Sequence, residues 1–187
     1  MSPEPVGVET VYVVERVLRE HALEHAFIGG LALSAWGVPR ATFDLDLTLA
    51  LPVERQGSLL AALRGLGWDV DEIFERGWRD QMAGMPVLSV RIPADGTLIR
   101  VDLLVAETPF LRSVLARRVE IDLGQGPIPL CTAADLLLFK LVAWRPKDRL
   151  DLDNILWVQG VPERDYLERW AGPLGVEERL REILATR

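Results

Sequence analysis

Two aspartates separated by one leucine are the residues of this sequence most suited to chemistry. Asp44 and Asp46 lie in the segment FDLDLTLA, where apolar and polar residues alternate as in a β-strand. Residues i and i+2 of a strand point to the same side, so both carboxylates project together. Two unpaired carboxylates this close repel each other, and a divalent cation between them removes the repulsion. Oxygen ligands of this kind favour Mg²⁺ or Mn²⁺ over zinc.

A third carboxylate, Asp102, lies in the apolar stretch LIRVDLLVA. This stretch also predicts a strand, which could run next to the strand of Asp44 and Asp46. Carboxylates on two neighbouring strands can hold two metal ions about 4 Å apart, which activate a hydroxyl and stabilise a leaving pyrophosphate. Two alternatives remain open: an ordinary solvated strand face for the Asp-x-Asp pair, and an ion pair with Arg100 for Asp102.

A glycine pair precedes the aspartates. Gly29 and Gly30 follow a short apolar strand predicted over 25–28 and precede a predicted helix over 31–36. Backbone N–H groups at such a junction can approach a phosphate closely, although most Gly-Gly pairs are only turns. Arg40 follows in the next loop and could contact a phosphate or an acceptor, or be a surface arginine.

The segment 131–156, CTAADLLLFKLVAWRPKDRLDLDNIL, contains the second group of charged residues. Lys140 interrupts an apolar helical stretch, so it must either reach solvent or bind an anion such as a triphosphate. Arg145 could bind the same anion, or it could pair with one of two nearby aspartates. Those aspartates, Asp148 and Asp151, share one helix face and either orient the two cations or cap the helix.

The composition predicts a globular protein. A chain of 187 residues that is 49% hydrophobic and 26% charged can bury a substantial core. The formal net charge of −7 argues against non-specific nucleic-acid binding. Cys131 is the single cysteine, no apolar run is long enough to span a membrane, and the N-terminal pattern is not that of a signal peptide. We therefore expect a cytoplasmic protein without membrane association.

The pattern along the chain predicts an α/β (α+β) fold. An α/β core over 1–130 is followed by a helical part over 131–187, packed on the core as a single compact unit, with a cleft between them suited to a ligand. Helices are predicted over 7–24, 53–66, 109–116, 132–144, 148–158, 163–171 and 176–185, and strands over 43–51, 87–92, 98–105, 118–123 and 127–130. Residues 73–85 predict only an irregular segment or a short helix.

The first block of motifs, G-G-x-A, G-x-x-R and T-x-D-x-D, resembles the nucleotidyltransferase (polymerase-beta-like) superfamily. The closest likeness is its AbiEii-type branch, which contains minimal nucleotidyltransferases and toxins of type IV toxin–antitoxin pairs. The segment 131–156 resembles the helical segment of that branch, and the whole resemblance covers roughly residues 25–158. The residues that carry it are Gly29, Gly30, Ala32, Gly37, Arg40, Thr42, Asp44, Asp46, Lys140, Arg145, Lys147, Asp148 and Asp151.

This resemblance implies a mixed β-sheet flanked by helices and an NTP bound with its phosphates at Gly29 and Gly30. It also implies metal ions on Asp44, Asp46 and Asp102, with Asp102 helping to deprotonate an acceptor hydroxyl. The implied reaction moves a nucleoside monophosphate to a hydroxyl of RNA or protein, and an antitoxin could be a partner. Two alternatives stay open, namely a small-molecule transferase of the aminoglycoside-modifying kind, which the acidic charge suits, and a catalytically silent nucleotide-binding or antitoxin-like protein.

Overall fold

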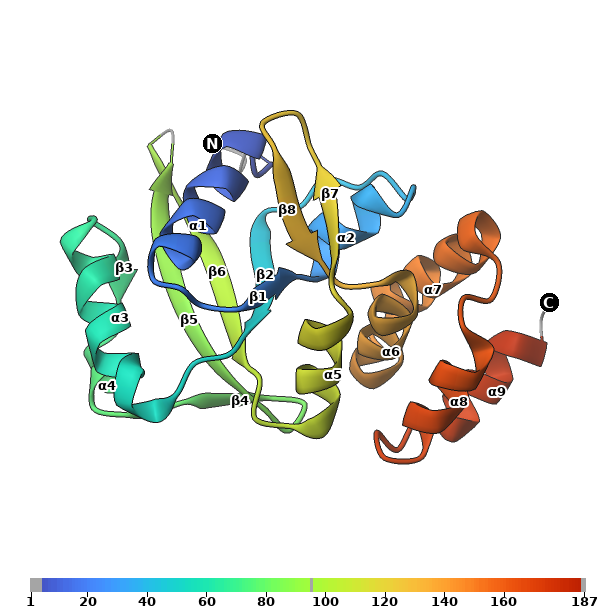
Figure 1. Cartoon of the computed structure of the whole chain (residues 1–187). Coiled ribbons are helices and arrows are strands. Elements are labelled where there is room, and N and C mark those ends of the chain that lie inside the picture. Colours follow the sequence, from blue (N-terminus) through green and yellow to red (C-terminus); the bar gives the residue numbers. More distant parts are fainter. Residues whose placement is uncertain (1–4, 95, 186–187) are drawn as a thin grey trace.

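A mixed β-sheet forms the centre of the molecule (Figure 1). The strands are β1 His25–Phe27, β2 Asp44–Leu49, β3 Asp69–Val70, β4 Asp80–Met82, β5 Met85–Ala94, β6 Thr97–Val105, β7 Val119–Asp122 and β8 Pro127–Leu130. The computed structural model describes residues 5–94 and 96–185, and within them the strands pair in the order β3-β5-β6-β2-β1-β8-β7, with β4 beside β5. β2 and β6 are parallel, whereas β1 and β2 are antiparallel.

Helices flank this sheet. They are α1 Val8–Glu20, α2 Gly29–Ala35, α3 Val53–Gly65, α4 Glu72–Glu75, α5 Pro109–Arg117, α6 Ala133–Ala143, α7 Pro146–Gln159, α8 Arg164–Ala171 and α9 Glu177–Ala185. The four C-terminal helices, coloured orange to red, gather on one side of the molecule (Figure 1). The predicted class, a mixed α/β fold with helices around a sheet, is confirmed.

The alternating pattern of β2 places its two kinds of side chain on opposite faces. Leu45, Leu47 and Leu49 have no exposed surface and belong to the hydrophobic core. Asp44 and Asp46 lie on the other face and keep partial exposure. β2 is therefore a central strand that packs the core with one face and presents two carboxylates on the other.

Helix α6 joins the helical part to the sheet. A capping box starts it: the Thr132 hydroxyl accepts from the backbone N–H of Asp135, and the Asp135 carboxylate accepts from the backbone N–H of Thr132. Its residues 136–138 are fully buried in the same core cluster as the sheet. Trp144 ends α6 in a left-handed conformation with φ 49°, and Pro146 opens α7. The two helices thus form a tight pair beside the sheet.

Some boundaries differ from the prediction. The first helix ends at Glu20 and not at residue 24, because Ala22 turns the chain with a φ of 49°. The region 73–85, predicted as irregular or a short helix, starts within the short helix α4. It also contains the unpredicted strand β4 and a two-residue turn at Ala83 and Gly84, both with positive φ, which suits a tight hairpin. The division of the chain into parts 1–130 and 131–187 stays a prediction. Residues 1–4 and 186–187 of these parts lie outside the described residues.

Within the described ranges, no helix is long and apolar enough to cross a membrane.

Candidate functional site

A pocket lies between the aspartate-bearing face of the sheet and the helices α6 and α7. On the sheet side it is lined by Gly29, Gly30, Arg40, Asp44, Asp46 and Arg100. On the helical side it is lined by Phe139, Lys140, Arg145, Lys147 and Asp148. The fold therefore brings to one pocket the glycine pair, the Asp-x-Asp pair and the cations of the helical segment, as predicted.

Asp46 has an unusual ionisation in this pocket. Burial, which has the largest effect, and the negative charges of Asp44 and Asp102 together raise its pKa from 3.8 to about 6. Lys140 and Arg100 oppose this rise without cancelling it. Burial and two neighbouring carboxylates thus disfavour the ionised form of Asp46, and a bound divalent cation would favour it.

Asp102 lies directly beside Asp46, since the two residues are register partners in the parallel pairing of β6 with β2. Its side chain has no exposed surface. The Ser89 hydroxyl of β5 donates to Asp102 Oδ1 at 2.6 Å, and Arg100 Nη2 forms an ion pair with Asp102 Oδ2 at 2.5 Å. The expected adjacency is confirmed, and the alternative partner Arg100 is also present.

The donor set fits a divalent cation at Asp44 and Asp46, which share a face, line the pocket and supply carboxylate oxygens. Asp102 does not present a free oxygen to that place. Among the residues that the structure describes, no group of three His, Cys, Asp or Glu side chains is arranged to hold a metal ion. Both Asp102 oxygens accept hydrogen bonds, from Ser89 and Arg100.

Gly29 and Gly30 allow the start of α2 to press against the aspartate strand. A Cβ at Gly29 would lie 2.1 Å from Asp46 Oδ2, and Gly29 has a φ of 62° that few other residues adopt. A Cβ at Gly30 would lie 2.6 Å from Thr42 Oγ1, and that hydroxyl donates to the Asp44 backbone oxygen at 3.0 Å. Both glycines are therefore required for close packing here, and their binding of phosphate stays a prediction.

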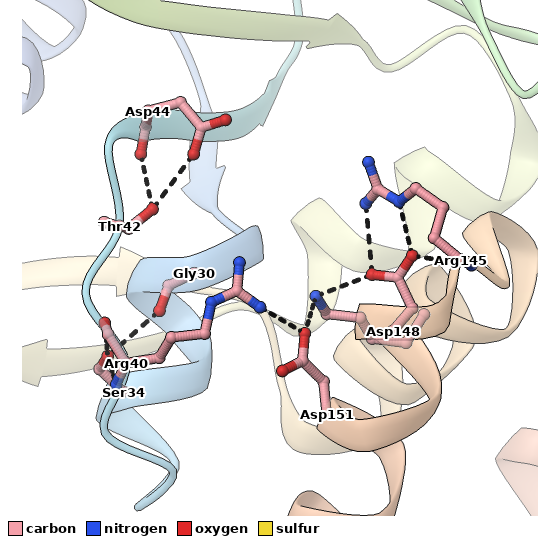
Figure 2. Close-up of polar contacts among 9 residues, drawn as sticks. Gly30, Ser34, Arg40, Thr42, Asp44, Arg145, Asp148 and Asp151 are labelled. Carbon is pink, nitrogen blue, oxygen red and sulfur yellow. Dashed lines mark hydrogen bonds and ion pairs between the residues drawn. The ribbon is translucent and has the colours of Figure 1, made fainter. Parts of the chain in front are cut away.

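The cations of the helical segment are held by two aspartates of α7. Lys140 Nζ donates to Asp148 Oδ1 at 3.1 Å and to Asp151 Oδ2 at 2.6 Å. Arg145 Nε donates to Asp148 Oδ2 at 2.6 Å. From the loop before β2, Arg40 Nη1 reaches across to Asp151 Oδ2 at 2.7 Å (Figure 2). This network links the two sides of the pocket.

Asp148 has both of the roles considered for these aspartates, helix capping and orientation of the cations. Asp148 accepts from the backbone N–H of Arg145, which caps α7, and it also orients Lys140 and Arg145. Burial alone would raise the pKa of Asp148, but the hydrogen bond from Arg145 and the charge of Lys140 lower it below its usual value. Arg145 keeps 58% of its side chain exposed, so its pairing leaves it accessible to a ligand in the pocket.

Sequence reasoning missed Ser89. A polar residue within the predicted strand 87–92 was the available signal, yet the pairing register that sets Ser89 opposite Asp102 is not readable from one sequence. The contact of Arg40 with Asp151 was also missed, because 111 residues separate the two in the chain and no local pattern brings them together.

A comparison with protein families decides the relationship. The sequence profile of the family "Nucleotidyl transferase AbiEii toxin, Type IV TA system" matches residues 13–166 of this chain. The chain belongs to this AbiEii nucleotidyltransferase family. No curated protein matches the sequence.

Solved structures share the fold at low sequence identity. An antigenic nucleotidyltransferase-like protein from Paracoccidioides brasiliensis matches with a TM-score of 0.57 and 15% identity, over 97% of this chain and 94% of that chain. The lincosamide antibiotic adenylyltransferase LnuA, lincomycin-bound, gives 0.57 and 13%, over 83% and 100%. ANT(2")-Ia, in complex with adenylyl-2"-tobramycin, gives 0.57 and 17%, over 87% and 96%. The fold of this AbiEii chain is thus nucleotidyltransferase-like, as expected.

Proposed function

We propose that this protein transfers a nucleoside monophosphate from an NTP to a hydroxyl acceptor, in the pocket between β2 and the helices α6 and α7. One observation carries the proposal: pocket-facing carboxylates, with the pKa of Asp46 raised to about 6, stand opposite the cations Lys140 and Arg145. Carboxylates that need a divalent cation and cations that need an anion together suit a metal-bound polyphosphate.

Each group of side chains has a distinct part in binding. Asp44 and Asp46 would hold Mg²⁺ or Mn²⁺, which when bound lowers the pKa of an attacking hydroxyl and neutralises the pyrophosphate. The backbone at Gly29 and Gly30 would approach the phosphates, since neither residue has a side chain in the way. Lys140 and Arg145 would contact phosphate oxygens from the helical side, where Arg suits bidentate contacts.

Arg40 and the two α7 aspartates complete the anion-binding side. Asp148 and Asp151 hold Lys140 in a fixed position, so the ammonium group loses little freedom when an anion binds. Arg40 shares Asp151 with Lys140 and is one-third exposed, so it can contact a phosphate or the acceptor.

The transfer itself makes one bond and breaks one. The acceptor oxygen bonds to the α-phosphorus, and the bond from that phosphorus to the bridging oxygen of the leaving pyrophosphate breaks. The hydroxyl proton passes to solvent water. Negative charge grows on the pyrophosphate as it leaves, and preorganised cations such as Lys140 and Arg145 stabilise charge that develops in this way.

For the acceptor we propose RNA or protein. The family description, which names a toxin of a type IV TA system, supports a toxin role with a cognate antitoxin. The net charge of −7 requires that RNA be bound through a local group of cations and not through the overall charge. Arg40, Arg145 and Lys147 provide such a group at the pocket rim.

A second candidate is a small-molecule acceptor, and one observation favours it. An apolar pocket formed by α5, α8 and the turns near them shares Ala83, Met85 and Val142 with the proposed nucleotide pocket. Its aromatic lining residues are Phe110 and Trp170, and none of its described lining residues is charged. Such a surface suits a neutral, partly apolar molecule better than a phosphate backbone.

Incubation with labelled NTPs and Mg²⁺ distinguishes these acceptors. Total RNA, cell lysate protein and a panel of hydroxylated antibiotics are offered separately, and the labelled product is identified by mass spectrometry. Label on RNA or protein supports the first proposal, and label on a small molecule supports the second. A wild-type protein that binds NTP with Mg²⁺ but labels none of them would favour a catalytically silent nucleotide-binding protein.

A further inference from the structure

Arg100 lies between the acidic residues of β2 and β6. It is the register partner of Asp44 and precedes Asp102 by two positions, so all three side chains share one face of the sheet. Its guanidinium is fixed to Asp102 Oδ2 at 2.5 Å, and its side chain is 54% exposed and lines the pocket. Arg100 is thus anchored to Asp102, and the exposed part of its side chain lines the pocket proposed for the NTP.

Asp102 differs from Asp44 and Asp46 in its surroundings. Its side chain has no exposed surface, whereas the other two line the pocket. One of its oxygens accepts from Ser89 and the other from Arg100. Removing the guanidinium would leave a buried carboxylate without a counter-charge, which is strongly destabilising. Both Asp102 oxygens are thus engaged and the residue does not line the pocket, so Asp102 is placed to hold Arg100 rather than to bind a metal ion.

The charges of the cluster balance with a single divalent ion. Asp44, Asp46 and Asp102 together can carry three negative charges when all are ionised. One divalent ion and the Arg100 guanidinium carry three positive charges.

We propose that Arg100 takes the place of a second metal ion: Asp44 and Asp46 hold one divalent cation, and Asp102 is a positioning residue that holds Arg100 against the nucleotide phosphates. The first claim, one cation on Asp44 and Asp46 (the cation part), concerns only the carboxylates of this chain. The second claim, the contact of Arg100 with phosphates (the phosphate part), rests on the proposed function. Arg100 has the charge and planar donors that bind phosphate oxygens.

Manganese binding to the full chain tests the cation part without any turnover. Mn²⁺ is titrated into the nucleotide-free protein and free Mn²⁺ is followed by electron paramagnetic resonance. Wild type should bind one Mn²⁺, and D102N should keep this site within about threefold, because Asp102 is not a ligand. D46N should weaken it by about tenfold or more, since even partners of metal ligands cost about 10- to 100-fold. Two Mn²⁺ per wild-type chain, or equal losses in D102N and D46N, would overturn the inference.

Nucleotide binding tests the phosphate part. With Mn²⁺ present, calorimetry with a non-hydrolysable NTP analogue should show about tenfold weaker binding for R100Q and partial recovery for R100K. Arg91→Gln is the matched control, because Arg91 is the register partner of Arg100 on β5 and also pairs with an aspartate, but it does not line the pocket. Equal affinity in R100Q and R91Q would overturn the role of Arg100. No analogue binding by wild type would contradict the proposed function, and the Mn²⁺ titration would still decide the cation part.

Discussion

Replacing Asp46 by asparagine is expected to stabilise the metal-free protein at neutral pH. Burial, together with the charges of Asp44 and Asp102, raises the pKa of Asp46 from 3.8 to about 6. A carboxyl group whose pKa is higher in the folded than in the unfolded chain weakens folding as the pH rises. This penalty is small below about pH 4, grows between about pH 4 and pH 6, and is complete above that range. One pKa unit is about 1.4 kcal/mol, so the full penalty is at most about 3 kcal/mol.

Urea denaturation in EDTA at about pH 4 and about pH 7.5 measures this effect. The free energy of unfolding of D46N should exceed that of wild type by up to about 3 kcal/mol at the higher pH and by less than about 1 kcal/mol at the lower. Asp69→Asn is the matched control: Asp69 is an exposed aspartate of β3 paired with Arg91 at 2.7 Å, and such pairs contribute about 0–1 kcal/mol. The reasoning is refuted if D46N is no more stable than wild type at about pH 7.5, or if it gains equally at both pH values.

Three further substitutions probe other contacts. Gly29→Ala should cost about 1–2 kcal/mol for the left-handed backbone and displace Asp46, so thermal denaturation and Mn²⁺ affinity should both fall; unchanged Mn²⁺ affinity would contradict the close approach. Lys140→Met should cost up to about 3 kcal/mol in urea denaturation, because two buried carboxylates of α7 lose a partner, and it should weaken NTP binding in calorimetry. Tyr166→Phe removes a 2.6 Å hydrogen bond to the buried Asp135 and should cost about 1–3 kcal/mol; an altered NTP affinity would argue against its purely structural role.

The elements that carry the acidic residues could be predicted because their patterns are local. The alternation of Leu45, Leu47 and Leu49 with polar residues is a period of two, and it placed both β2 carboxylates on one face. The apolar run around Asp102 predicted a second strand, and the structure sets it parallel to β2. The resemblance in motif spacing supplied the fold, and the family match confirms that relationship.

The state of each side chain could not be predicted in this way. The ion pair of Asp102 with Arg100 was one of two alternatives that the sequence left open. The second partner, Ser89, could not be foreseen, because Ser89 meets Asp102 only through the register in which β5 pairs with β6. The hairpin of β4 and β5 depends on a positive φ at Ala83, a residue type that gives no turn signal. Arg40 meets Asp151 only after the helical part has packed beside the sheet.

The position of the transferred label tests the central claim most directly. Wild-type protein is incubated with Mg²⁺, acceptor and one NTP labelled at either the α- or the γ-phosphorus, with D46N and D69N measured in parallel. The account predicts covalent label on the acceptor from the α-labelled NTP alone, its loss in D46N and its retention in D69N. Label that arrives from the γ-position, or α-label that is transferred equally well by D46N, would contradict it.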